Sequence, residues 1–188
     1  MKPQAYPSLD SIVEYRDGVR ESVYGYFSML KSGKVISSNP LLYLGATPAE
    51  VDKIRDELLA EEDRRTRFAL LTYIEATFKA HFLYIVDYKK KSPLLKPFKR
   101  LHYHNGKLAS NVSLERHILK EWRKCGRISD EFYIKLVGAL HFRHWFAHGR
   151  FLELTPSPRG ISLYDYSELY MLAQTSRNLC SEAEPYLS

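Results

Sequence analysis

Apolar residues recur at intervals of three and four along most of this chain, which is the spacing of one face of an α-helix. The pattern predicts a helix over residues 8–32, with Ser8 as its N-cap. A second helix is predicted to open at Thr47 and Pro48, with an acidic residue three positions after the cap. No proline or glycine interrupts this pattern before Pro93, so the second helix is expected to be long.

The second half of the chain alternates turn signals with shorter helical patterns. Residues 92–111 hold two prolines and an Asn-Gly pair, which favour a loop with at most one short turn of helix. A short helix is predicted from Ser113 to Gly126, a longer one after Ser129, and a last one over about 162–180. Because no strand pattern or internal repeat is found, the predicted fold class is all-α, a bundle of four to five helices in one domain of 188 residues.

The overall composition excludes several classes of protein. Hydrophobic residues make up 45% of the chain and charged residues 27%, which is ordinary for a globular protein. Cys125 and Cys180 lie far apart and form no CxxC pair, which argues against a disulfide scaffold and a thiolate zinc site. The N-terminus lacks the apolar core of a signal peptide, and charged residues interrupt the most apolar window, residues 68–88. We therefore expect a cytoplasmic protein without a membrane span.

Positive charge is concentrated in one segment. Residues 89–127 contain twelve Lys or Arg against two acids, a net charge of +10, whereas the whole chain carries +6. Aromatic and histidine side chains occur in the same segment, and this mixture can neutralise phosphates and stack on bases. The alternative is a solvated basic face that aids solubility.

Glu75 lies in the middle of an apolar helical face. The face is defined by steps of three and four residues through Phe68, Leu71, Phe78, Phe82 and Ile85. A carboxylate buried there without a partner would cost several kcal/mol or take up a proton, so a cation or several hydrogen bonds must lie nearby. The sequence leaves two interpretations of such a pair: one that holds two helices in register, or part of a functional site.

The stretch LHFRHWFAHGR, residues 140–150, carries three of the seven histidines of the chain. On a helical wheel, His141, His144 and His148 lie within about 60° of one another, and the apolar face of this helix turns cationic at Arg143. A zinc site is not favoured, because such sites usually draw on more than one element and HxxHxxxH is not HExxH. For His141 we expect the role of a surface histidine near a helix end.

The segment RHWFAHGR resembles the R-x4-6-H motif of the HEPN superfamily, in which Asn, Asp or His commonly follows the arginine. The preceding helix with IEATF, centred on Glu75, looks like the second core helix of such domains, where an acidic residue often faces the active site. The resemblance covers roughly residues 62–154, flanked by the helices over 8–32 and 162–180, with residues 89–127 as a basic insertion of loop and short helix. It implies a HEPN-like bundle with a long second helix that dimerises and cuts RNA without a metal.

The resemblance also implies roles for single residues. His148 would perform general acid-base catalysis, Arg143 would bind the scissile phosphate, His144 would orient or share the proton transfer, and Glu75 would fix Arg143 or an imidazole tautomer. Attack by the 2′-hydroxyl would leave a 2′,3′-cyclic phosphate and a 5′-hydroxyl. No metal or other cofactor is expected. The residues expected to bind RNA are Lys89, Lys90, Lys91, Lys99, Arg100 and Arg150.

The motif leaves the biological setting open. The leading hypothesis is a toxin or defence effector whose partners are RNA, a second copy of the chain, and an antitoxin or another defence-system protein. Some toxin members carry a tyrosine after the motif that an antitoxin modifies, whereas Gly149, Arg150 and Phe151 follow His148 here. The alternatives are a non-catalytic HEPN module that binds RNA, a nucleotide or a protein, and a metallohydrolase built on the three histidines.

Overall fold

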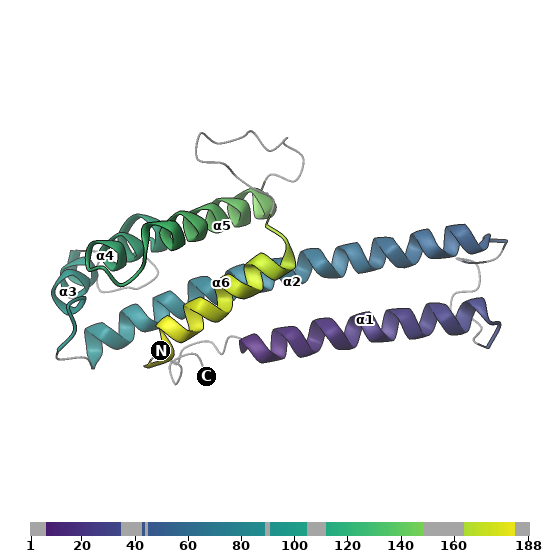
Figure 1. Cartoon of the computed structure of the whole chain (residues 1–188), viewed down its shortest axis with the longest axis horizontal. Coiled ribbons are helices and arrows are strands. Elements are labelled where there is room, and N and C mark those ends of the chain that lie inside the picture. Colours follow the sequence, from purple (N-terminus) through teal and green to yellow (C-terminus); the bar gives the residue numbers. More distant parts are fainter. Residues whose placement is uncertain are drawn as a thin grey trace. The chain divides into compact units, whose positions relative to one another are not determined.

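The computed structural model describes residues 7–34, 43, 45–88, 91–104, 112–148 and 164–182, with backbone only over 145–148. Every regular element in these ranges is helical, which confirms the all-α fold class (Figure 1). The elements are α1 (Leu9–Lys31), α2 (Pro48–Asp87), α3 (Leu95–His104), the π-helical turn η3 (Leu114–Ile118), α4 (Leu119–Lys124), α5 (Asp130–His148) and α6 (Tyr166–Leu179). Across the described part of the chain, none of the helices has the length and apolar character needed to cross a membrane.

The chain forms two compact units. One consists of Asp10–Arg67, and the other of Met1–Leu9 together with Phe68–Ser188. Helix α2 has residues in both units: those up to Arg67 belong to the first unit and those from Phe68 onward to the second. The single domain expected from the sequence stays a prediction.

The Asp10–Arg67 unit contains α1 and the first part of α2, which run in opposite directions (Figure 1). As predicted, Thr47 and Glu50 form a capping box: the Glu50 backbone N–H donates to Thr47 Oγ1 at 3.3 Å, and the Thr47 N–H donates to Glu50 Oε2 at 2.7 Å. Lys31 at the end of α1 pairs with Asp52 of α2, with 2.6 Å between Nζ and Oδ2. Among the described residues of this unit, the buried apolar ones are Ile12, Phe27, Val51 and Leu59.

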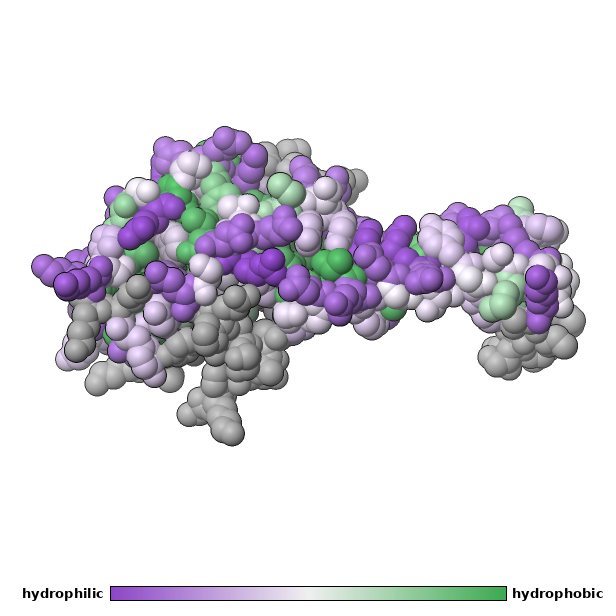
Figure 2. Space-filling model, turned by 60° about the horizontal axis from the view of Figure 1, so that its bottom comes forward, coloured by the Kyte–Doolittle hydropathy of each residue, from purple (hydrophilic) through white to green (hydrophobic). Residues whose placement is uncertain are grey.

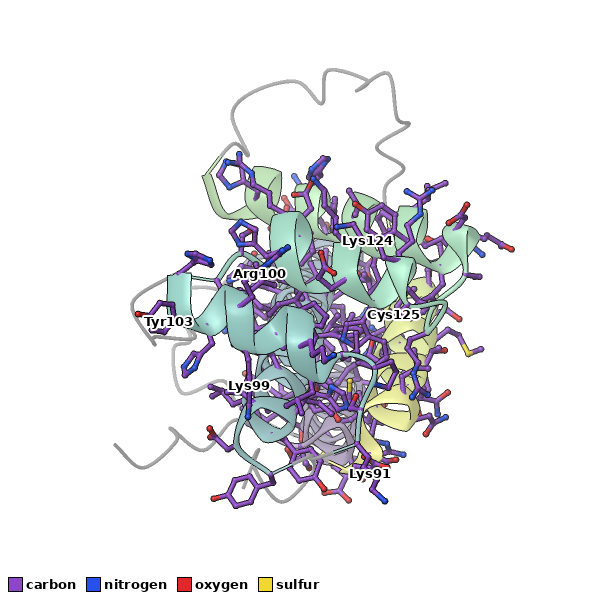
Figure 3. The ribbon with its side chains drawn as sticks, turned by 90° about the vertical axis from the view of Figure 1, so that its left-hand side faces the viewer. Lys91, Lys99, Arg100, Tyr103, Lys124 and Cys125 are labelled. Carbon is purple, nitrogen blue, oxygen red and sulfur yellow. The ribbon has the colours of Figure 1, made fainter. Side chains whose placement is uncertain are left out.

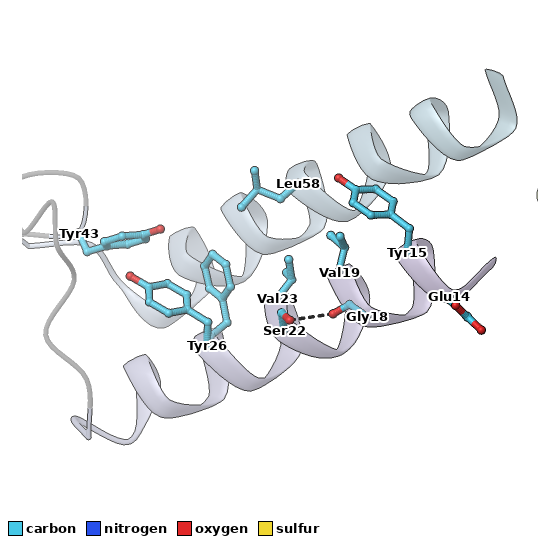
Figure 4. A pocket seen from close by; sticks show the side chains of 10 residues that line it. Glu14, Tyr15, Gly18, Val19, Ser22, Val23, Tyr26, Tyr43 and Leu58 are labelled. Carbon is cyan, nitrogen blue, oxygen red and sulfur yellow. Dashed lines mark hydrogen bonds between the residues drawn. The ribbon is translucent and has the colours of Figure 1, made fainter. Parts of the chain in front are cut away.

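An apolar groove of about 540 Å³ runs along this unit (Figure 4). Its lining includes Val19 and Val23 of α1, Leu58 of α2, and the rings of Tyr15 and Tyr26. Tyr15 is 62% exposed and Leu58 is 48% exposed. Two helices therefore leave part of their apolar surface in contact with solvent.

In the Phe68–Ser188 unit, the second part of α2 contacts three other helices. The ring of Phe82 lies 4.9 Å from that of Phe98 on α3, and the ring of Phe78 packs edge-on against Trp122 of α4 at 5.2 Å. An ion pair from α2 reaches Arg143 on α5. Four of the five residues of the predicted apolar face of α2 are at most 2% exposed, namely Leu71, Phe78, Phe82 and Ile85, whereas Phe68 is half-buried. On the face of the molecule in Figure 2, hydrophilic side chains are interspersed with hydrophobic ones.

Three local predictions need correction. Residues 95–104, expected as a loop, form the ten-residue helix α3. Its proline, Pro97, falls in the first turn, where a backbone N–H is not needed for the helix. The short helix after Ser113 begins with the π-helical turn η3 rather than directly as an α-helix. Helix α6 begins at Tyr166, not near residue 162, because Asp165 forms a capping box with Glu168.

Gly138 of α5 packs so closely on Tyr164 that a Cβ atom there would overlap the tyrosine hydroxyl oxygen.

Both cysteines are free thiols, but their surroundings differ. Cys125, half-buried, lies just after α4 and its Sγ is 3.9 Å from the Pro93 carbonyl oxygen, whereas burial of Cys180 to 2% exposure raises the pKa of its thiol.

Candidate functional site

Glu75 of α2 pairs with two cations. Its Oε2 accepts a hydrogen bond from Arg143 Nη1 on α5, and its Oε1 lies 2.7 Å from Lys79 Nζ, one turn further along α2. The Glu75 side chain is 21% exposed, so it is partly shielded from water without being fully buried. The sequence predicted that this carboxylate needs a nearby cation or several hydrogen bonds, and the ion pairs confirm it.

Arg143 is positioned by α5, which begins after Ser129. The Ser129 hydroxyl accepts a hydrogen bond from the Phe132 N–H, and Asp130 and Glu131 lie in the first turn, where acidic side chains are favourable. The side chain of Arg143 is 32% exposed, and its Cζ lies 5.8 Å from the ring centre of Phe68. This distance is within the range of a cation–π contact. A carboxylate and an aromatic ring therefore both contact this guanidinium.

The Glu75, Lys79 and Arg143 trio carries one negative and two positive charges, and so has a net charge of +1. Such a cluster neutralises its carboxylate and still attracts an anion. The guanidinium has five N–H donors in a planar fork, which suits two phosphoryl oxygens at once. The trio can therefore bind a phosphate while keeping the arginine in one orientation.

The two motif histidines are placed by the same helix. His144, the residue after Arg143, is exposed, and His148 is the last residue of α5. The side chain of His148 lies outside the described residues, as do Lys89, Lys90 and Arg150. Among the described side chains, no group of three His, Cys, Asp or Glu has the arrangement of a metal site.

His141 has a partner that the sequence did not indicate. Its Nε2 lies 3.2 Å from Glu115 Oε1 on η3, and both side chains are about one-third exposed. The contact joins two elements separated by 26 positions in the chain. His141 is thus a link between α5 and η3, a role that sequence periodicity could not predict because the partner lies on another helix.

The described RNA-binding candidates lie at a different place from the trio. Lys99 and Arg100 are exposed on α3, and Lys91 is exposed on the turn before it (Figure 3). They share this end of the unit with Lys124 and with Tyr103, which is 70% exposed. The predicted site residues therefore form two groups, Glu75 with Arg143 on α2 and α5, and the cations on and before α3.

Comparisons with protein-family models, with curated proteins and with solved structures find no match. Function is therefore inferred from the residues of this chain and from their geometry.

Proposed function

We propose that this chain is a metal-independent endoribonuclease of the HEPN type. The observation that carries the proposal is the ion pair between Glu75 of α2 and the Arg143 guanidinium of α5. Helix α5 also bears His144 and ends at His148. The all-helical fold and the 40-residue α2 support a HEPN-like bundle with a long second helix. The proposed setting is the cytoplasm, where a homodimer acts as a toxin or defence effector with an antitoxin or another defence-system protein.

The proposed reaction needs only protein side chains. His148 takes the proton from the 2′-hydroxyl, whose oxygen attacks the neighbouring phosphorus while the bond to the 5′-oxygen breaks. The leaving oxygen accepts a proton from a second imidazole, His144 or His148 of the partner subunit. Arg143 binds the non-bridging oxygens, where negative charge develops. The products are a 2′,3′-cyclic phosphate and a 5′-hydroxyl, and DNA is not cut because it lacks the nucleophile.

Glu75 acts through Arg143 and does not touch the substrate. A carboxylate that orients the guanidinium before RNA arrives reduces the reorganisation needed in the transition state. Lys79 shares the negative charge of Glu75, so Arg143 keeps part of its positive charge for the phosphate. Glu75→Gln should therefore lower kcat more than it raises KM, and Glu75→Asp should recover less than the full rate because the shorter side chain retracts the carboxylate.

The test is incubation of the purified protein with total RNA, with and without EDTA. Cleavage fragments should accept radiolabelled phosphate from polynucleotide kinase without prior phosphatase treatment, because their 5′ ends carry a hydroxyl. His148→Ala should slow cleavage about 100- to 10,000-fold, since general acid-base catalysis is lost. Arg143→Ala should slow it about 100- to 1,000-fold, since the charge on the phosphoryl oxygens is no longer stabilised. EDTA should leave the rate unchanged.

Two matched variants control for indirect effects. Arg65→Ala removes an arginine that is also paired with a glutamate, Glu61, in the other unit. His141→Gln removes an imidazole from α5 and keeps a hydrogen-bonding side chain toward Glu115. Both should cut RNA at the wild-type rate. Cleavage that persists in Arg143→Ala and His148→Ala, that stops in EDTA, or that occurs on an all-deoxy substrate would contradict the proposal.

The second candidate is a non-catalytic HEPN module that binds RNA, a nucleotide or a protein. It is favoured by the ion pair itself, because a guanidinium engaged by Glu75 can serve as a structural tie between α2 and α5. This candidate predicts salt-dependent RNA binding by the wild type without new 5′-hydroxyl ends. The kinase-labelling experiment separates the two candidates.

A further inference from the structure

Helix α3 exposes a face without any acidic residue. The exposed residues are Lys96, Lys99, Arg100, Tyr103 and His104, and the opposite side is anchored by the fully buried Phe98. Spacings of three, four and seven residues place Lys96, Lys99, Arg100 and Tyr103 on one side of the helix. The helix therefore presents three cations and one aromatic ring to solvent in a single row.

Segments before and after α3 in the chain carry further exposed cations. Lys91 precedes α3, Arg116 lies on η3, Lys120 on α4, and Arg127 just after α4. All four are exposed, and Figure 3 shows Lys91, Lys99, Arg100 and Tyr103 at one end of the unit. We define the cationic face as Lys91, Lys96, Lys99 and Arg100; together with Arg116, Lys120 and Arg127, they make seven exposed cations.

These seven side chains make no ion pair or hydrogen bond within the part of the chain that the structure describes. The two other described cations of this segment do have partners: Arg123 pairs with Asp130 at 2.6 Å and Lys124 with Glu121 at 2.7 Å. Like charges four residues apart, such as Lys96 and Arg100, repel each other. The face thus keeps its positive charge at a cost to folding.

The other unit shows that unpaired cations are not a general property of this chain. Between Asp10 and Arg67, seven of the nine Lys and Arg residues pair with a carboxylate: Arg16, Lys31, Lys53, Arg55, Arg64, Arg65 and Arg67. If the cations served only to keep the surface solvated, a similar share of them would be expected to pair with carboxylates in both units. The contrast between the two units indicates that the cationic face is kept open for a polyanion.

We infer that the cationic face binds the backbone of single-stranded RNA, with Tyr103 stacking on an unpaired base. The cations neutralise phosphates, and an aromatic ring with 70% exposure offers a platform that any base can use. A single strand is favoured over a duplex because bases in A-form RNA are already stacked and paired. An anionic membrane is disfavoured because the exposed side of α3 has no aliphatic side chain to insert. Only the choice of RNA over DNA rests on the proposed function.

The test compares two triple variants that remove the same charge. Lys96→Gln, Lys99→Gln and Arg100→Gln together alter the cationic face, and Lys53→Gln, Arg64→Gln and Arg65→Gln together alter paired cations in the other unit. Binding to a fluorescein-labelled single-stranded RNA is measured by anisotropy over roughly 50–200 mM salt. Both triples are made in the His148→Ala background, so that cleavage does not interfere.

The loss of three phosphate contacts should make the negative slope of log K against log salt shallower by about 2, and should weaken binding about 100-fold at 0.1 M salt. The control triple should bind within a factor of about 3 of its parent. Tyr103→Ala should weaken binding between about 5- and 150-fold without changing the slope, because it removes a stacking surface and no charge. Replacing Lys96 and Lys99 by Arg keeps the positive charge and should therefore preserve binding. This control would show that substitution at these positions does not by itself disturb the fold.

Several outcomes would overturn the inference. One is an equal loss of binding in both triples, which would mean that only net charge matters. A second is equal affinity for a duplex of the same sequence, or no effect of Tyr103→Ala. A third is that vesicles of phosphatidylserine and phosphatidylcholine in equal parts bind the face in preference to RNA.

The two proposals can fail separately. RNA that binds the cationic face without being cut by the wild type would refute the nuclease and leave this inference standing. The triple variant of the cationic face is also made with His148 intact. If it cuts RNA with an unchanged KM, this inference is refuted, whereas the proposed nuclease activity is supported.

Discussion

The ion pair between Glu75 and Arg143 should contribute to the stability of the Phe68–Ser188 unit. The Glu75 side chain is 21% exposed and the Arg143 side chain 32%. Exposed ion pairs contribute little to stability, whereas breaking a buried pair costs several kcal/mol, and this pair is intermediate in exposure. We therefore expect a coupling energy of about 1–2 kcal/mol between the two residues. Since the pair is partly shielded, high salt should reduce the coupling without abolishing it.

A double-mutant cycle of Glu75→Gln and Arg143→Met measures this coupling. Methionine keeps an unbranched apolar stem near the ring of Phe68. Because Lys79 also contacts Glu75, the four proteins carry Lys79→Met in common, which leaves Arg143 as the remaining cation of the trio. Without this background, Lys79 would partly replace the missing arginine and the coupling would be underestimated.

The assay is urea denaturation followed by tryptophan fluorescence. Both tryptophans of the chain, Trp122 and Trp145, belong to the Phe68–Ser188 unit, so the signal follows the unit that contains the ion pair. A coupling of about 0.5 kcal/mol or less is the range found for independent sites, and would refute the reasoning.

Three further predictions concern single positions. Gly138→Ala should destabilise the protein by about 1–3 kcal/mol in urea denaturation, because the added methyl group would displace Tyr164 from the Lys135 carbonyl to which its hydroxyl donates at 2.9 Å. Gly18→Ala in α1 should instead stabilise by about 1 kcal/mol, since nothing lies within 4 Å of the new Cβ atom, and a loss of stability there would contradict the assignment of open space. Hydrogen bonds from Thr47 hold the pKa of Glu50 below its usual value of 4.5, so this carboxylate stabilises the folded chain above that pH and the stabilisation is lost as the pH falls through the lower folded pKa. The thermal midpoint of Glu50→Gln, measured by circular dichroism, should consequently fall less steeply below pH 4.5 than that of the wild type.

Local sequence signals predicted the helices well where periodicity and caps agreed. The capping box at Thr47 and Glu50 could be predicted from the sequence because both partners lie within four residues of each other. The need of Glu75 for a partner followed from its place on an apolar face, although only the structure shows that Arg143 and Lys79 are those partners. Helix α3 was missed because Pro97 and the following Asn-Gly pair outweighed its short apolar face.

Features that depend on contacts between distant segments could not be predicted. The link between His141 and Glu115 joins two helices, and no periodicity within one helix indicates it. The sequence showed that residues 89–127 are rich in cations, but not which of them find a carboxylate in the fold. That distinction separates Arg123, which pairs with Asp130, from Lys120, which has no such partner among the described residues.

The contrast between the two cysteines makes the unaltered chain suitable for site-selective labelling. The thiolate is the nucleophile in alkylation, and the buried Cys180, with its raised pKa, should react very slowly with a maleimide. Cys125, half-buried after α4, should take up the reagent first. A dye or spin label attached there would stand at the end of the unit that displays Lys99, Arg100 and Tyr103 (Figure 3), and would sense a strand of RNA arriving on that surface without any engineered residue.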